Sequence, residues 1–210
     1  MNPLLLGGII ALAVAATGQY FFGKRKNKAL AGTISVECER VLAPKDKDYV
    51  NIGGAIGYNF TYKLSDPWTE AKGAMTFAPR MSLMYLPFSY ILGMRDRFFL
   101  NIFTKRKLAG EAHLLNASYY RKHGGTIEGR DKLTQENYDL NGKSFVLLYD
   151  DPALAEPLRA MLRDLPEPGR LRHFCCYGAN KTFFLFIEPK PGLVAASLEA
   201  LKPRLGDFLR

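Results

Sequence analysis

An uncharged N-terminal segment that ends in a basic cluster is the feature that most limits what this chain can fold into. Residues 3–22 (PLLLGGIIALAVAATGQYFF) contain no Asp, Glu, Lys or Arg. At about 1.5 Å of rise per residue, a helix of this length covers roughly 30 Å, the thickness of bilayer hydrocarbon. A helix also pairs its own backbone groups, which lipid cannot do. The segment predicts a transmembrane anchor over residues 1–23.

Aromatic and basic residues follow the apolar segment and predict its orientation. Aromatic rings favour the headgroup region, and the positive-inside rule retains Lys and Arg on the cytoplasmic side. We therefore expect a single-pass protein of the inner (cytoplasmic) membrane, with its N-terminus outside and residues 24–210 in the cytoplasm. The basic juxtamembrane segment is 24–32. The residues expected at the interface, where they would meet anionic lipid headgroups, are Tyr20, Phe21, Phe22, Lys24, Arg25, Lys26 and Lys28.

A cleaved signal peptide is the main alternative to an anchor. It requires a positively charged start, and neither Met1 nor Asn2 has a charged side chain. The alanines at positions 13, 15 and 16 could nevertheless form a small-residue cleavage site. The anchor is the interpretation that we adopt.

Small residues recur every fourth position inside the apolar segment. Gly7, Ala11 and Ala15 form a stripe on one helix face, which would let another helix approach closely in lipid. This spacing predicts contact with the helices of an integral membrane protein complex. The alternative is that Gly and Ala are simply common in membrane spans.

Composition limits the class of the remaining chain. Its net charge is +9, and all charged residues lie after residue 23. A membrane surface explains this basic character, and without a nucleic-acid-binding motif we expect no nucleic-acid partner. Three cysteines, two of them adjacent, do not form a disulfide framework.

Hydropathy patterns predict an α+β fold. Residues 33–125 are expected to be rich in β-strands, starting with the alternating segment TISVEC (33–38). Further strands are expected over residues 58–64, 97–105 and 111–121. Residues 126–143 are polar and contain glycine, and are interpreted as a linker or long loop. Residues 144–210 show the order β-α-β-β-α, which is typical of a compact layered unit.

The apolar segment 74–94 is expected to dock on the membrane or on a partner. It is rich in methionine and aromatic residues, and Pro79 and Pro87 exclude a second regular span. An ordinary connection buried in the domain is the alternative. The residues expected to make the contact are Phe77, Arg80, Met81, Met84, Tyr85 and Phe88.

Motifs for catalysis, cofactors or metals are not recognisable. His173, Cys175 and Cys176 are the only soft-ligand cluster, but adjacent residues of a strand point to opposite faces, and neither His113 nor His123 is an obvious further ligand. Asp151 is expected to cap a helix. We therefore assign no catalytic, cofactor-binding or metal residues.

These observations favour a non-enzymatic accessory subunit of a larger membrane complex, with its helix packed against partner helices and its domain covering the cytoplasmic face. The alternative is a membrane-tethered enzyme or an anionic-lipid-handling protein with a site near the basic region 95–123.

Overall fold

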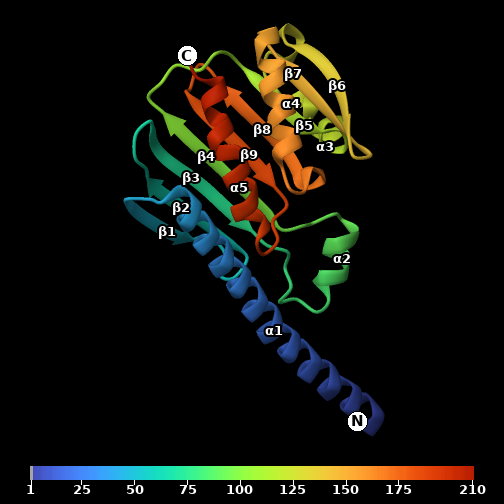
Figure 1. Cartoon of the computed structure of the whole chain (residues 1–210). Helices are drawn as coiled ribbons and strands as arrows, with labels where there is room; N and C mark the ends of the chain where they lie inside the picture. Colours follow the sequence, from blue (N-terminus) through green and yellow to red (C-terminus); the bar gives the residue numbers. More distant parts are fainter. Residues whose placement is uncertain (1) are drawn as a thin grey trace.

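The computed structural model describes residues 2–210 (Figure 1). Helix α1 (Pro3–Leu42) runs without interruption from the apolar segment, through the basic cluster, into the domain. The Asn2 side chain caps it by accepting a hydrogen bond from the backbone N–H of Leu4 at 3.0 Å, and Pro3 occupies a first-turn position that needs no N–H donor. The helix ends at Ala43, whose φ of 47° is left-handed.

Within residues 2–210 the strands form one nine-stranded antiparallel sheet in the order β1-β2-β3-β4-β9-β8-β5-β7-β6. The first four strands are a meander, the β8–β9 hairpin extends it, and β5 lies between β8 and β7. The α+β class is therefore confirmed, and one sheet runs through both parts of the chain. The strands are β1 (Asp46–Asn51), β2 (Gly57–Lys63), β3 (Trp68–Thr76), β4 (Arg97–Thr104), β5 (Ala112–Asn116), β6 (Thr134–Leu140), β7 (Lys143–Tyr149), β8 (Leu171–Tyr177) and β9 (Thr182–Ile187).

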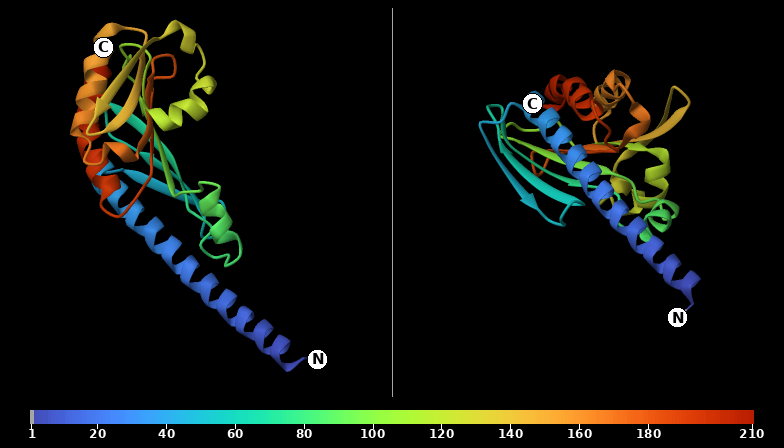
Figure 2. Two further views of the ribbon diagram at one scale, coloured as in Figure 1. Left: turned by 90° about the vertical axis from the view of Figure 1, so that its right-hand side faces the viewer. Right: turned by 90° about the horizontal axis from the view of Figure 1, so that it is seen from below.

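Helices cover one face of the sheet. The C-terminal half of α1 lies there with α4 (Ala155–Asp164) and α5 (Leu193–Arg204), as Figure 2 shows from below. The buried positions of α1 recur every three or four residues, which is the spacing of one helix face. They are Gly23, Asn27, Ala31, Ile34, Glu37, Cys38 and Leu42.

The expectation of a strand over residues 33–38 is wrong, because these residues are helical. Ile34 and Cys38 are buried and Val36 is 66% exposed, as on a helix face rather than on an alternating strand. Six residues are too few to distinguish the two periods, since positions i and i+4 share a face in both. The helix that starts in the apolar segment simply continues.

Two other segments differ from the expected pattern. Residues 111–121, expected as one strand, form β5 and then α3 (Ala117–His123), because the Asn116 side chain caps α3 by accepting from the backbone N–H of Ser118 at 3.0 Å. Residues 126–143, expected as a linker, contain β6. This edge strand is polar because most of its side chains are exposed to solvent, so it shows no apolar alternation.

Polar contacts fix α1 to α5. The buried Glu37 carboxylate accepts hydrogen bonds from the backbone N–H groups of Gly192 at 2.6 Å and Ala195 at 2.9 Å, at the start of α5. Near its end, the Lys202 ammonium donates to the carbonyl of Val41 at 2.8 Å. A carboxylate at a helix N-terminus and a cation near its C-terminus both complement the helix dipole. Helix α1 is therefore joined to the domain by specific contacts.

Candidate functional site

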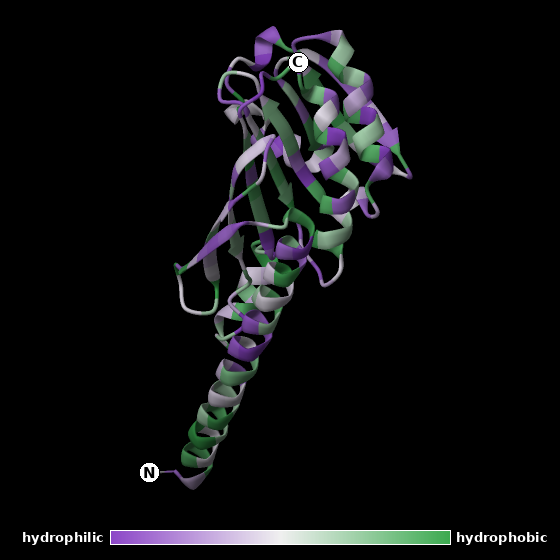
Figure 3. Cartoon of the chain, turned by 60° about the vertical axis from the view of Figure 1, so that its left-hand side comes forward, coloured by the Kyte–Doolittle hydropathy of each residue, from purple (hydrophilic) through white to green (hydrophobic). Residues whose placement is uncertain are grey.

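The apolar half of α1 projects away from the domain. It is long and apolar enough to cross a membrane, and none of its most apolar 18-residue window is buried against the rest of the chain. Figure 3 shows this apolar half of the helix, followed by a hydrophilic band. Gly7, Ala11 and Ala15 lie on this half and are exposed. The expected interface residues, from Tyr20 to Lys28, follow on the same helix.

The loop before α2 (Tyr85–Ile91) is fastened to α1 at this boundary. Asn27, fully buried, donates from Nδ2 to the carbonyl of Ala78 at 3.0 Å and accepts at Oδ1 from Arg80 Nη1 at 2.8 Å. Gln19 Nε2 donates to the Arg80 carbonyl at 2.6 Å. Gly23 is required here, because a Cβ atom would overlap the backbone of Arg80.

Two of the expected docking residues serve the domain itself. Phe77 is buried in the main core, so the expectation that it contacts a membrane or partner is wrong. Arg80 forms a two-pronged ion pair with Asp96, at 2.8 and 2.6 Å, and both side chains are 14% exposed. Arg80 therefore holds the loop and is not a free cation at the surface. Local sequence does not indicate this role, because both partners of Arg80 are distant in the chain.

Four apolar residues of this segment are exposed on α2 or directly beside it. Met84, Phe88, Ile91 and Leu92 are 62–82% exposed and follow the i, i+4, i+7, i+8 spacing of one helix face. Tyr85 is also exposed, at 42%, whereas Met81 is half-buried. Figures 1 and 2 place α2 level with the part of α1 where the apolar half gives way to the basic residues. An exposed apolar helix face of this kind is typical of a surface that contacts a partner or a membrane.

A basic pocket of about 390 Å³ lies between α2, α3 and the open face of the sheet. The pocket brings Arg95 and Arg97, which precede or begin β4, next to Lys122 of α3. Its cation Arg172 is paired with Glu188, at 3.0 and 2.7 Å. Arg95, Arg97 and Lys122 form no ion pair with another residue of the described range 2–210, and these three unpaired cations line the pocket together with Leu92, which follows α2. The region 95–123, which the sequence indicated, supplies most of this lining.

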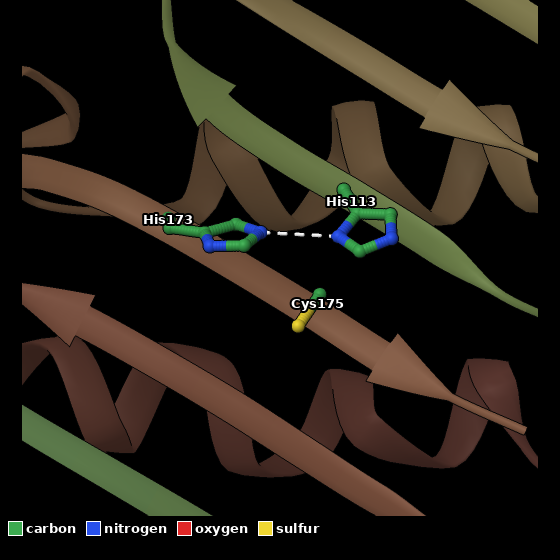
Figure 4. A group of neighbouring side chains, drawn as sticks. All are labelled: His113, His173 and Cys175. Carbon is green, nitrogen blue, oxygen red and sulfur yellow. Dashed lines mark hydrogen bonds between the residues drawn. The ribbon is translucent and has the colours of Figure 1, made fainter. Parts of the chain in front are cut away.

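A second polar cluster lies buried between β5 and β8. The ligand atoms of His113, His173 and Cys175 all lie within 4.8 Å of one another (Figure 4). His113 Nδ1 faces His173 Nε2 at 3.1 Å, and His113 Nε2 faces the Glu111 carboxylate at 2.9 Å. Sequence reasoning considered His113 and did not select it as a ligand, because it meets Cys175 only through the register between β5 and β8. As expected, Cys176 points to the opposite face and joins the main core.

Burial determines the protonation of this cluster. Desolvation lowers the pKa of His173 to about 3, with a smaller contribution from His113, so its imidazole is neutral at physiological pH. Desolvation also lowers the pKa of His113, although Glu111 opposes the shift. The thiol pKa of Cys175 is raised by burial.

Asp151 is a helix cap, as expected, and accepts from the backbone N–H of Ala153 at 2.9 Å.

The sequence matches no protein-family model, and no curated protein matches it.

Proposed function

We propose that this protein is a non-enzymatic, single-pass accessory subunit of a larger membrane protein complex. The observation that supports this best is the form of α1: its apolar half is uncovered by the rest of the chain, while its other half is fastened into the domain. A helix with no partner of its own in lipid is suited to packing against partner helices. The domain would then be held at a defined orientation to the complex.

The proposed orientation places the domain on the cytoplasmic side of the inner membrane. Lys24, Arg25, Lys26 and Lys28 all follow the apolar half, and no charged side chain precedes it. Positive charge is retained on the cytoplasmic side during insertion. The cluster would also attract anionic headgroups, at about 1 kcal/mol per residue near the surface.

The proposal is tested by measuring the size of the detergent-extracted assembly in native electrophoresis. Ala11→Leu with Ala15→Leu fills the small-residue stripe and should release the chain from the large assembly without preventing insertion. The matched control is Ala13→Leu with Ala16→Leu, which adds the same bulk to the other side of the helix. An unchanged assembly in the stripe variant would contradict the proposed helix packing.

In this proposal α2 dips into the membrane interface beside α1. Its exposed apolar face and the cation Arg95, which lies over the Tyr90 ring of α2 at 5.4 Å, match the layered chemistry of that interface. Full burial of a large apolar side chain contributes about 1.5–3 kcal/mol, so partial insertion of the four exposed apolar side chains contributes several kcal/mol to membrane binding.

Lipid contact of α2 can be measured with a single tryptophan. Trp68 is the only native one, so Trp68→Phe provides a silent background. Phe88→Trp in this background should be quenched by lipids brominated in the upper acyl chain. Val36→Trp, at an exposed apolar position beyond the basic cluster, should remain unquenched. Equal quenching of the two would disprove insertion of α2.

The basic pocket favours a second candidate function, the handling of anionic lipids. Its three unpaired cations adjoin the apolar face of α2, which would place a headgroup phosphate beside its acyl chains. Native mass spectrometry with added phosphatidylglycerol tests this. Arg97→Gln with Lys122→Gln should reduce the number of bound lipids, whereas the exposed pair Arg130→Gln with Lys132→Gln should not. Retention of lipid by both variants would exclude the pocket.

A further inference from the structure

The buried histidine–cysteine cluster has the arrangement of a metal site. His113 and Cys175 are direct register partners on β5 and β8, and His173 lies two residues before Cys175. His113 and Cys175 are fully buried, and His173 is 8% exposed. Three potential ligands from two strands thus converge on one point, on the sheet face away from α4 and α5.

The hydrogen bond to Glu111 prepares one histidine as a ligand. The Glu111 carboxylate can only accept, so the proton of neutral His113 lies on Nε2, at 2.9 Å from the carboxylate oxygen. The lone pair of Nδ1 then points at His173, 3.1 Å away (Figure 4). A carboxylate that holds the outer nitrogen of a ligating histidine is the usual outer contact of a zinc site.

We propose that His113 Nδ1, His173 Nε2 and Cys175 Sγ bind a borderline-soft divalent metal ion of the Zn²⁺ class. Two imidazoles and a thiolate suit such an ion, whereas Ca²⁺ and Mg²⁺ require oxygen ligands. The nitrogens of a tetrahedral zinc site lie about 3.3 Å apart, close to the separation found here, and a nitrogen and a sulfur about 3.6 Å apart. Since the ligand atoms lie within 4.8 Å of one another, the thiol needs to approach by about 1.2 Å at most.

Protons balance in a simple way when the ion binds. The Cys175 thiol loses its proton to solvent, and the proton of His173 moves from Nε2 to Nδ1. One proton is therefore released for each ion, and the thiolate charge partly neutralises the metal. Three protein ligands leave a fourth position for water. The rings of Tyr119 and Phe184, at 6.2 and 5.4 Å from His173, form an apolar surround.

The site is tested with the full chain in detergent, using Zn²⁺ and Co²⁺ alone as probes. Equilibrium dialysis followed by elemental analysis should give one Zn²⁺ per chain. Bound Co²⁺ should show a thiolate-to-metal charge-transfer band. Absence of that band, or of stoichiometric Zn²⁺, in the unmodified chain would overturn the proposal and leave a hydrogen-bonded histidine pair only.

Adjacent cysteines supply a matched pair of variants. Cys175→Ser should weaken Zn²⁺ binding at least tenfold and abolish the Co²⁺ band. Cys176→Ser changes an equally buried thiol on the opposite face and should retain both properties. Equal loss in the two variants would assign the effect to folding rather than ligation, and equal retention would place the metal elsewhere; each result refutes the site. A Co²⁺ band in the unmodified chain that disappears only in Cys175→Ser confirms it.

Discussion

Replacing Asn27 by alanine tests how strongly this one side chain holds the loop before α2 against α1. Asn27 accepts from Arg80 and donates to the carbonyl of Ala78, in a fully buried position. The variant removes both hydrogen bonds and leaves the buried Ala78 carbonyl without its donor. Arg80 keeps its ion pair with Asp96, so the loop retains its internal structure while its attachment to α1 weakens.

The magnitude follows from the two bonds that are lost. A neutral hydrogen bond contributes about 0.5–1.5 kcal/mol and one to a charged group about 1.5–3 kcal/mol. The Gln19 contact and the packing against Gly23 remain, so we expect the local opening free energy to fall by about 2–3 kcal/mol. That change corresponds to roughly 30- to 150-fold faster amide exchange over residues 78–92.

Hydrogen–deuterium exchange of the full chain in lipid nanodiscs measures this directly. Lys28→Ala removes an exposed neighbour on the same helix and should leave the exchange of residues 78–92 unchanged. The strands should exchange at the same rate in both variants, because their ladder bonds are untouched. Exchange of residues 78–92 that is the same in Asn27→Ala and in the unmodified chain would refute the reasoning.

Three further outcomes are expected. Protease added to the cytoplasmic face of inverted vesicles should digest residues 24–210, and protection of this region would reverse the proposed orientation. Glu37→Ala should lower the free energy of unfolding by about 2 kcal/mol, because α5 loses the carboxylate that accepts its first backbone N–H groups. Urea titration followed by Trp68 fluorescence measures this change. An equal loss of stability in the control Glu199→Gln, at an exposed ion pair, would contradict the explanation. Hydrogen bonds from Arg159 lower the pKa of Glu136, so its stabilisation is complete above the unfolded value near 4.5 and is lost as pH falls through the lower folded value. Glu136→Gln should therefore flatten the decline in stability in that acid range, and an unchanged pH profile would exclude the contribution.

Local sequence predicted the helices and strands whose apolar pattern is long enough to identify the type of element. The apolar half of α1, the strands β2, β4, β7, β8 and β9, and the helices α4 and α5 all lie close to their expected positions. Each shows either a periodic apolar face or, as in β7 and β9, a continuous apolar run, and such apolar surface must be buried in any fold that the chain adopts. The same logic separated Cys175 from Cys176, because adjacent strand residues face opposite ways.

Tertiary structure decided the features that a short local pattern leaves open. Residues 33–38 are helical because α1 continues through them and buries Ile34 and Cys38 against the sheet, which no six-residue pattern could reveal. The sequence also left open whether Phe77 and Phe88 lie in the core or at the surface, because both are large apolar residues in the same apolar segment. In the structure Phe77 packs in the main core, near Tyr58 of β2, whereas Phe88 is 62% exposed on α2.

The candidate sites follow the same division. The sequence indicated a basic region at 95–123, because charge is a property of composition. It could not indicate that β5 lies between β7 and β8 in the sheet, since hydrogen-bonded strand order depends on contacts between residues far apart in the chain. That strand order places His113 beside Cys175, which lies 62 positions later in the chain. The resulting set of ligands comes from two distant segments, so no local sequence motif contains it.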